Sequence, residues 1–418
     1  MLRSVATGDW IADRGWVRPE LGGACFASLP GAITELLTGD AIGPTLPTAL
    51  TDGLEDRYDR VVLVYFDAFG CELAARVADH PLLAGAAVHA RLTSQFPSTT
   101  TVHMTTIQTG QPVGEHGLYE WFILEPRLDR LIAPLPFCFA GDGQPQLTGR
   151  LEPGELYPDR SVYEWLGARD VASVVCGGYG YGTSATSTAL LRGASAQVGY
   201  HDVGEGLAEL AAVFAALPAP AYGFVYIDTI DSLMHKVGPG AHALIDAEVT
   251  SLLDAIERRL LRALPEGTLV LLTSDHGMAP VSPGETTYLN AGPRGVEVRS
   301  HLRSGAEPGG HPLAPAGSCR DLFLHAEPGH VEDLVDVLRR VVGERAEVRR
   351  RDELVDAGLF GPSPTERLLE RLGDVAVLPQ FGDAVYWYTP GRFRQALWGQ
   401  HGGLTPQEME IPLVAVVA

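Results

Sequence analysis

The chain has 418 residues, of which 45% are hydrophobic and 20% charged, and this composition is typical of a globular protein with a sizeable core. Its 31 basic and 52 acidic residues leave a net charge of −21, which argues against binding to a nucleic-acid polymer, because each phosphate contact needs a nearby Lys or Arg. A small anionic substrate is still compatible with this charge, since a bound cation can invert the local field.

No targeting or membrane-spanning segment is predicted. The first 16 residues contain no apolar stretch of the kind found in secretory signals. The longest uncharged run, residues 210–227, is interrupted by Pro218, Pro220 and Gly223, which favours a helix end, a turn and a strand. The five cysteines form no C-x-x-C pair and are expected as free thiols in a reducing compartment. We therefore predict a cytoplasmic protein that does not bind a membrane.

Buried strands alternate with helical patterns along the first two thirds of the chain. Continuous apolar runs predict strands at residues 61–66, 171–176, 222–227 and 268–273, and a further strand at 410–418. An apolar stripe from Ile245 to Leu264 predicts a helix before the strand at 268–273. This alternation predicts an α/β fold with a mostly parallel central sheet that is covered by helices on both faces.

The composition changes after Met278. Residues 280–317 are rich in Pro and Gly and predict a long loop or a small excursion. They are followed by a strand, a helix and a second strand, expected at 322–324, 331–342 and 347–350. We therefore predict a smaller α+β lobe over residues 281–375, inserted into a core formed by residues 1–280 and 376–418.

Asp and His side chains follow several of the predicted strands. Parallel sheets gather the loops at the carboxyl ends of their strands, so these side chains are expected to lie close together. Asp and His together suit zinc or manganese better than magnesium, which prefers oxygen ligands alone. The sequence therefore predicts a metal site, and its candidate ligands are Asp67, Asp231, His235, Asp275, His276 and His401.

A second candidate feature is the segment FPSTTTVHMTTIQTG at residues 96–110. Pro97 and the following hydroxyl residues indicate a helix start, and Gly110 indicates its end. The N-terminus of a helix favours an anion, and a Thr hydroxyl there can act as a nucleophile if a metal or a base removes its proton. This pattern does not choose among its four hydroxyl residues, which could equally cap the helix: Ser98, Thr99, Thr100 and Thr101.

The order of the motifs FDAFG, FPSTT…TG, EHG, DSLMHKVGP, SDHGM and GQHGGLTPQEM resembles the type I phosphodiesterase / nucleotide pyrophosphatase family of the alkaline phosphatase superfamily. The resemblance runs from about Val61 to the C-terminus and implies an alkaline-phosphatase-like core. It also implies that Thr100, the last residue of a P-x-x-T pattern, is the nucleophile. Two Zn²⁺ ions are implied, with Mn²⁺ as an alternative: one is held by Asp67, Thr100, Asp275 and His276, and the other by Asp231, His235 and His401.

The implied activity is that of a metal-dependent phosphoric ester hydrolase. It would cleave small phosphate diesters, nucleotides or other phosphoanhydrides through a phospho-threonine intermediate. Two other reactions on the same scaffold stay open, namely hydrolysis of a phosphonate C–P bond and of a phosphomonoester. A sulfatase is disfavoured, because none of the cysteines lies in a C-x-P-x-R segment.

The sequence departs from the family pattern near the substrate. Nucleotide-cleaving members carry an Asn after the His-Gly motif, and counting on from His116 places Trp121 there, so we expect Trp121 to bind substrate. His116 itself is expected to pack beside the site. An aromatic residue often follows the nucleophile, but here it is Thr101, which leaves a nucleobase slot unsupported. GGYGYG at 177–182 favours a glycine-rich loop over a dinucleotide site, because no clear amphipathic helix follows it.

Overall fold

The apolar runs form the strands of one central sheet. The computed structural model describes residues 9–141, 143–180, 182, 184–306 and 312–418. Its seven-stranded sheet has the order β2-β18-β9-β1-β8-β6-β7, and only β18 runs antiparallel to its neighbours. The strands are β1 (Arg60–Phe66), β2 (Val88–Thr93), β6 (Ala172–Gly178), β7 (Ala196–Tyr200), β8 (Ala221–Ile227), β9 (Leu269–Thr273) and β18 (Glu410–Val417). The predicted mostly parallel α/β sheet is confirmed.

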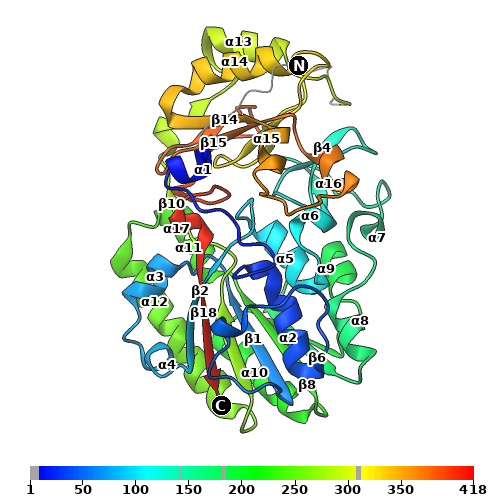
Figure 1. Cartoon of the computed structure of the whole chain (residues 1–418), viewed down its shortest axis with the longest axis vertical. Coiled ribbons are helices and arrows are strands. Elements are labelled where there is room, and N and C mark those ends of the chain that lie inside the picture. The colour runs from blue at the N-terminus through cyan, green and yellow to red at the C-terminus, as the bar shows by residue number, and fades with distance from the viewer. Residues whose placement is uncertain (1–8, 142, 181, 183, 307–311) are drawn as a thin grey trace.

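Helices cover both faces of this sheet because its strands are apolar on both sides. Val62 and Val64 of β1 pack with one layer of helices, whereas Val61 and Leu63 pack with the other. The first layer holds α3 (Cys71–Arg76), α4 (Pro81–Ala84), α10 (Val203–Ala216), α11 (Thr229–Val237) and α12 (His242–Ala255). The second holds α2 (Leu29–Thr38), α5 (Thr100–Thr109) and α8 (Val162–Gly167). Figure 1 shows α12 and α2 on opposite sides of the sheet.

The helix predicted from Ile245 to Leu264 differs in one respect. Helix α12 ends at Ala255, and the chain continues through a π turn at Ile256–Leu260 and a 3₁₀ turn at Leu261–Ala263. The buried residues of this stripe are mostly four apart, which exceeds the 3.6 residues of an α-helical turn. The π turn has more residues per turn than an α-helix and therefore matches this four-residue spacing, which keeps Ile256 and Leu260 in the core.

A second, antiparallel sheet forms the core of a smaller lobe, at the top of Figure 1. Its strand order is β12-β13-β15-β14, with bounds β12 (Ala316–Gly317), β13 (Leu322–Leu324), β14 (Ala346–Arg350) and β15 (Val375–Pro379). Helix α14 (Val331–Val342) contributes Leu334, Val337 and Leu338 to the same hydrophobic core. The additional lobe is therefore present, while its boundaries at residues 281 and 375 stay predictions.

Shorter elements connect the sheets. The remaining strands form one three-stranded and two two-stranded sheets: β3 (Ile123–Glu125) with β4 (Arg130–Ala133) and β5 (Cys138–Phe139), β10 (Ala279–Pro280) with β17 (Gly399–Gln400), and β11 (Thr287–Tyr288) with β16 (Val385–Tyr386). The remaining helices are α1 (Trp10–Asp13), α6 (Val113–His116), α7 (Pro153–Leu156), α9 (Ala185–Leu190), α13 (Gly292–Ser300), α15 (Arg351–Asp356), α16 (Glu366–Arg371) and α17 (Pro406–Met409).

A buried ion pair ties the lobe to the end of the chain. The guanidinium of Arg320, between β12 and β13, donates to both carboxylate oxygens of Glu408 in α17, at 3.0 and 2.8 Å. Both side chains are completely buried. Glu408 also accepts hydrogen bonds from the backbone N–H of Gly403 and the hydroxyl of Thr405, so the pair holds the loop that precedes α17.

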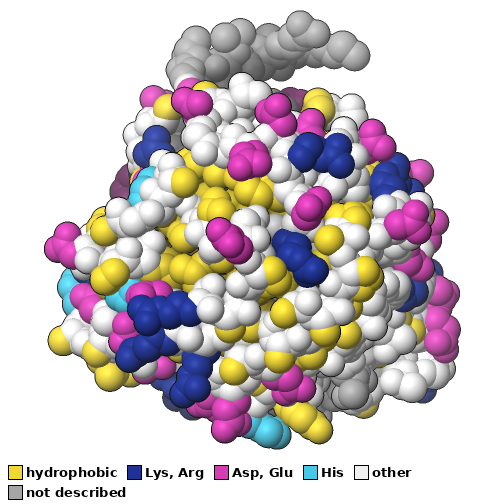
Figure 2. All heavy atoms as spheres, turned by 90° about the horizontal axis from the view of Figure 1, so that it is seen from below, with side chains coloured by type: hydrophobic (Ala, Val, Ile, Leu, Met, Phe, Trp, Pro, Cys, Tyr) yellow, Lys and Arg dark blue, Asp and Glu magenta, His cyan; other side chains and the backbone are white. Residues whose placement is uncertain are grey.

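Acidic side chains are dispersed over one face of the molecule. Figure 2 shows acidic side chains spread over the face seen from below, with basic ones only in small groups, so this face offers no broad basic surface. Among the described residues, no helix is both long enough and apolar enough to cross a bilayer.

Replacing Arg320 by Met is expected to lower the free energy of unfolding by about 3–5 kcal/mol, because the carboxylate of Glu408 would stay buried without its cationic partner. Denaturant unfolding followed by circular dichroism measures this change. Arg345→Met is the matched control, since Arg345 is 57% exposed and lies 3.9 Å from Asp383, and its loss should be below about 1 kcal/mol. Equal effects of the two substitutions would contradict the role given to the buried pair.

Candidate active site

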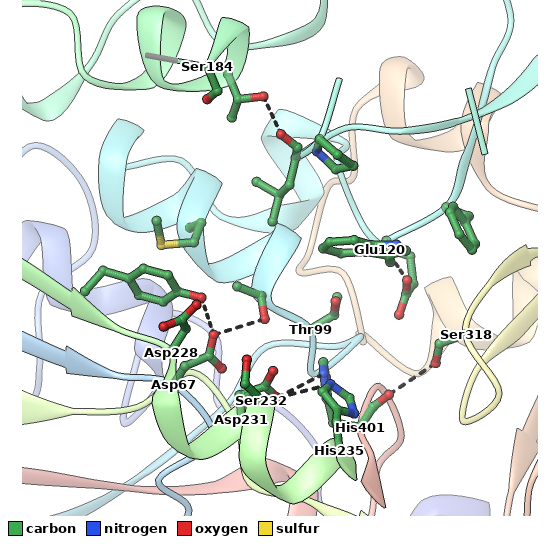
Figure 3. A pocket seen from close by; sticks show the side chains of 18 of the residues that line it. Asp67, Thr99, Glu120, Ser184, Asp228, Asp231, Ser232, His235, Ser318 and His401 are labelled. Carbon is green, nitrogen blue, oxygen red and sulfur yellow. Dashed lines mark hydrogen bonds and ion pairs between the residues drawn. The ribbon is translucent and has the colours of Figure 1, made fainter. Parts of the chain in front are cut away.

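The topology of the central sheet brings the candidate ligands to one edge. Strands β1, β8 and β9 run parallel, so Asp67, Asp231 and Asp275, which follow them, meet at their carboxyl ends. Because β18 runs antiparallel, the loop before it reaches the same edge and delivers His401. Thr100 is the first residue of α5. Figure 3 shows Asp67, Asp231, His235 and His401 around one cavity.

Four of the predicted residues form a first cluster. The Nε2 atom of His276 lies 3.2 Å from Asp275 Oδ2 and 3.4 Å from Asp67 Oδ1. The hydroxyl oxygen of Thr100 lies 3.4 Å from the same His276 nitrogen and 3.5 Å from Asp67 Oδ2. The structure therefore brings together Asp67, Thr100, Asp275 and His276, the four residues that the family resemblance assigns to one metal ion.

The other three predicted residues lie directly beside this cluster. Asp231 and His235, one turn apart on α11, have their Oδ1 and Nε2 atoms 3.3 Å apart, and His401 Nε2 lies 3.7 Å from the same Asp231 oxygen. The rings of His276 and His401 stack with their centroids 3.6 Å apart. The ligand atoms of Asp231, His276 and His401 all lie within 4.8 Å of one another, so the two clusters share one site.

Backbone carbonyls set the tautomers of the three histidines. Nδ1 of His235 contacts the carbonyl of Gly399 at 2.8 Å, Nδ1 of His276 that of Gly277 at 2.9 Å, and Nδ1 of His401 that of Ser98 at 2.9 Å. A carbonyl only accepts hydrogen bonds, so each Nδ1 carries the proton and each Nε2 lone pair faces the cluster. This is the arrangement that a metal-binding histidine needs.

Two other buried histidines do not have a free nitrogen. Nε2 of His103 lies 2.9 Å from the backbone N–H of Gln95, which donates to it. Nδ1 of His116 accepts from the backbone N–H of Leu118, and its Nε2 contacts the hydroxyl of Thr106. His116 is thus engaged in packing beside the site.

Each aspartate of the site has one buried carboxylate oxygen without a hydrogen-bond partner among the described residues, and Asp67 and Asp275 are held through their other oxygen. Asp67 Oδ2 accepts from the hydroxyl of Tyr226, and Asp275 Oδ1 accepts from the backbone N–H groups of Ala68 and His276 at 3.2 and 2.9 Å. Asp67 Oδ1, Asp231 Oδ1 and Asp275 Oδ2 are buried and have no hydrogen-bond partner among the described residues. Buried polar atoms without partners are rare in proteins, and these three all face imidazole nitrogens.

The electrostatics of the site favour the binding of a cation. Burial and the neighbouring carboxylates of Asp275 and Asp231 raise the pKa of Asp67 well above its usual range, and burial raises the pKa of Asp231 to about 6. Burial lowers the pKa of His276 and of His401 well below the usual value, so both rings are neutral. Within the part of the chain that the structure describes, no Lys or Arg forms an ion pair with these aspartates.

The donor set fits divalent cations of the zinc type. Zinc binds His nitrogens and carboxylate oxygens at about 2.0–2.2 Å in a tetrahedron, which places neighbouring ligand atoms about 3.3–3.6 Å apart. The contacts between the candidate ligand atoms span 3.2 to 3.7 Å. The unpaired carboxylate oxygens and the outward Nε2 lone pairs are therefore spaced for metal binding.

The site opens into a cavity of about 880 Å³, which is within the size range of small-molecule sites. Trp121 lines it and is 42% exposed, so its indole lies at the mouth. Apolar side chains line the inner part, and they include Met104, Val175, Leu190 and Phe224. The glycine-rich loop also reaches the cavity through Gly177 and Gly180, whereas Tyr181 lies outside the described residues.

Two residues of the site were not predicted. The hydroxyl of Tyr226 binds Asp67, and the only signal in the sequence is a tyrosine near the end of an apolar strand. Glu120 lines the cavity but is only 1% exposed, and in the sequence it is an ordinary charged residue before Trp121. Both depend on contacts between segments far apart in the chain.

Comparison with known proteins gives one matching family and several similar structures. The sequence model of the family described as type I phosphodiesterase / nucleotide pyrophosphatase matches residues 61–402. Murine ectonucleotide pyrophosphatase / phosphodiesterase 5 has a similar structure, with a TM-score of 0.62 and 18% identity over 85% of this chain and 87% of that one. A second structure of the murine protein, an inactive Thr-to-Ala variant in complex with AMP, gives the same values. The human protein has a TM-score of 0.60 and 16% identity at the same coverage. No curated protein sequence matches the chain.

We expect the chelator-treated protein to bind two divalent cations, and Asp275→Asn to bind one fewer, because the buried Oδ2 atom of Asp275 has no other partner. Elemental analysis after dialysis against zinc measures the stoichiometry. Asp79→Asn, a change at an exposed acid, is the matched control. Equal metal contents of the wild type and the Asp275 variant would contradict the assignment.

Cation binding should weaken as the pH falls through about 6. Burial raises the pKa of Asp231 to about 6, so protons compete with a cation for this carboxylate at a higher pH than at an exposed aspartate. Titration calorimetry with zinc at pH 7.5, 6.5 and 5.5 measures the effect. An affinity that does not change over this range would count against Asp231 as a ligand.

Proposed function

The chain belongs to the type I phosphodiesterase / nucleotide pyrophosphatase family of the alkaline phosphatase superfamily, and on that premise we propose that it is a di-zinc enzyme that cleaves small phosphate diesters or phosphoanhydrides through a phospho-threonine intermediate. Membership makes it a phosphoric ester hydrolase of a metal-dependent family. The observation that carries the proposal is the position of the Thr100 hydroxyl, 3.5 Å from Asp67 Oδ2 and 3.4 Å from His276 Nε2.

The surroundings of the four hydroxyl residues support Thr100 as the nucleophile. Ser98 is buried, and its hydroxyl donates to the carbonyl of Gly403 at 2.8 Å. Thr101 is buried, and its hydroxyl has no hydrogen-bond partner among the described residues. Thr99 lines the cavity, but its hydroxyl has no contact with the aspartates or histidines of the clusters in the described part of the chain. Only Thr100 combines access to the cavity with contacts to the first cluster.

The residues of the two clusters would bind cations, and Thr100 would also position the phosphoryl group. Asp67, Thr100, Asp275 and His276 would hold one cation, and Asp231, His235 and His401 the other. When bound, the two cations would acidify the Thr100 hydroxyl and neutralise charge on the phosphoryl oxygens. As the first residue of α5, Thr100 also places the phosphoryl group at a helix N-terminus, where backbone N–H groups favour an anion.

The reaction then has two displacements at phosphorus. The Thr100 oxygen forms a bond to phosphorus while the bond to the leaving oxygen breaks, and the leaving group departs as an alcohol or phosphate. Water next forms a bond to phosphorus while the threonine oxygen leaves, which restores the hydroxyl and releases a phosphomonoester. Orientation and charge neutralisation are the main requirements of such a transfer, so an acidic protein can perform it.

Nucleotides and related diesters are the proposed substrates. The murine relative has been solved with AMP, and this cavity has room for a nucleotide-sized group. Trp121, Phe122 and Tyr386 supply aromatic surface along its wall, and we propose that Trp121 binds the substituent of the substrate.

Wild-type protein with zinc should hydrolyse bis(p-nitrophenyl) phosphate faster than p-nitrophenyl phosphate, and Thr100→Ala should lower kcat by at least about 1,000-fold, because no group replaces the nucleophile. Release of p-nitrophenolate measures both rates. Thr101→Val is the matched control, since the Thr101 hydroxyl has no partner to lose. Full activity of Thr100→Ala would overturn the nucleophile, and a preference for the monoester would favour a phosphatase over a diesterase.

Trp121→Ala is expected to raise KM for a nucleotide diester about 10-fold and to change kcat less than about 3-fold, because stacking on an aromatic ring contributes about 1–3 kcal/mol to binding. Steady-state kinetics with the p-nitrophenyl ester of thymidine 5′-monophosphate measure the effect. Phe381→Ala removes an aromatic ring that is also about half exposed but does not line the cavity, and it should change neither constant. Unchanged kinetics of the Trp121 variant would remove it from the substrate site.

A further inference from the structure

Two histidines and an aspartate meet on the smaller lobe, outside the catalytic cavity. His301 directly follows α13, His330 directly precedes α14, and Asp333 lies in the first turn of α14. Atoms that can bind a metal, one from each of the three side chains, all lie within 4.8 Å of one another. None of the three residues lines the cavity, so this cluster is separate from the two clusters of the active site.

The packing of α13 against α14 brings the two histidines together. Val298 of α13 and Leu334 of α14 are completely buried in the same hydrophobic core. Glu297 and Arg340 link the same two helices through an ion pair. Figure 1 shows α13 and α14 side by side in the lobe. The C-terminal end of α13 therefore meets the N-terminal end of α14.

Backbone hydrogen bonds fix the positions from which both rings extend. The carbonyl of His301 accepts from the backbone N–H of Glu327 at 2.8 Å, and the backbone N–H of His330 donates to the carbonyl of Glu327 at 2.9 Å. Leu302 and Ala326 form an antiparallel bridge beside them. A metal would therefore meet a pair of ligands that the fold has already placed, which lowers the entropic cost of binding.

The two rings face each other through their Nδ1 atoms. Nδ1 of His301 lies 3.0 Å from Nδ1 of His330, and the ring centroids are 5.3 Å apart. Without a metal, this contact needs a proton on one of the two nitrogens, because two lone pairs repel. Moving that proton to Nε2 of the same ring makes both Nδ1 lone pairs available without any net change in charge. In the active site, by contrast, a backbone carbonyl occupies Nδ1 of each histidine.

Asp333 supplies negative charge for a cation. Within the described part of the chain it forms no ion pair with a Lys or Arg, whereas its neighbour Glu332 pairs with Arg350 at 2.9 Å. The two histidines are half-buried and Asp333 is exposed, so an ion can enter from solvent and water can complete its coordination.

The spacing of the nitrogens indicates the class of metal. At metal–nitrogen distances of about 2.0–2.1 Å, two nitrogens at right angles lie about 2.8–3.0 Å apart, and two in a tetrahedron about 3.3–3.4 Å. The observed 3.0 Å fits the right angle, which is the geometry that Cu²⁺ and Ni²⁺ prefer with nitrogen and oxygen ligands. Such ligands also bind Cu²⁺ more tightly than Zn²⁺.

We propose that His301, His330 and Asp333 form a third metal site, which binds Cu²⁺ or Ni²⁺ and joins α13 to α14. The site goes beyond the proposed function and does not depend on it, because none of its residues lines the substrate cavity. The bound ion stabilises the lobe, since separating the two helix ends would break its bonds to the ligands.

The test adds Cu²⁺ to zinc-loaded protein and follows binding by electron paramagnetic resonance and elemental analysis. The wild type should bind one Cu²⁺ with two nitrogen ligands and keep its zinc. His330→Ala and His301→Ala should each lose this Cu²⁺ signal, and circular dichroism checks that both variants are folded. His242→Ala changes an exposed histidine at the start of α12 and is the matched control, which should bind Cu²⁺ as the wild type does.

Asp333→Asn keeps the test decisive if the histidine variants do not fold. It changes one exposed side chain and should raise the Kd for Cu²⁺ about 10-fold or more, because even residues that only orient a ligand change metal affinity 10–100-fold. An unchanged Kd in this variant would contradict the assignment of the carboxylate.

Amide hydrogen exchange measured by mass spectrometry locates the ion. At a free Cu²⁺ concentration of 100 times Kd, exchange through openings that separate α13 from α14 should slow by up to about 100-fold. This protection should cover residues 298–303 and 328–335 in the wild type and be absent from His330→Ala.

Three results would overturn the proposal: a wild type that binds no Cu²⁺ beyond its zinc, a Cu²⁺ signal that is unchanged in His330→Ala, or protection that lies elsewhere in the chain. The second result would show adventitious binding to surface histidines only. Hydrolysis of bis(p-nitrophenyl) phosphate should be the same in His330→Ala as in the wild type, so failure of this site and failure of the proposed function give different results.

Discussion

The repulsion among three carboxylates, two of them buried and one half-buried, is the constraint on which the rest of the site depends. Asp67, Asp231 and Asp275 lie at one edge of the sheet without a Lys or Arg partner among the described residues, and each has one carboxylate oxygen without a hydrogen-bond partner. In a folded protein this arrangement is costly unless cations are bound. The topology of the sheet imposes it, because β1, β8 and β9 end side by side.

The surrounding structure serves to hold this edge in shape. Backbone carbonyls orient the three histidines, and the antiparallel β18 returns the His401 loop to the cluster. Gly402 adopts a φ of 126°, which a side chain would strain, and it leaves room for Asp321. The Arg320–Glu408 pair anchors the same loop from the side of the lobe. The lobe thus contributes to the site through buried polar contacts as well as by covering it.

Local patterns in the sequence were sufficient for five of the seven strands of the central sheet and for the set of candidate ligands, whereas the two edge strands β2 and β7, which alternate between buried and more exposed residues, were not predicted. Apolar runs mark strands that are buried on both faces, and the residue types that follow them are those that bind zinc. The π turn after α12 and the contact of Tyr226 with Asp67 could not be predicted, because they arise from packing between elements. Thr100 could be chosen among four hydroxyl residues only through the family resemblance, and a cytoplasmic location stays a prediction.

The stereochemical course at phosphorus tests the covalent threonine intermediate most directly. The substrate is one diastereomer of a phosphorothioate diester, hydrolysed in ¹⁸O-labelled water, with the configuration of the product read by ³¹P NMR. Two in-line displacements, first by Thr100 and then by water, each invert the phosphorus centre, so net retention is expected. Net inversion would show that water attacks the substrate directly and would contradict a phospho-threonine intermediate.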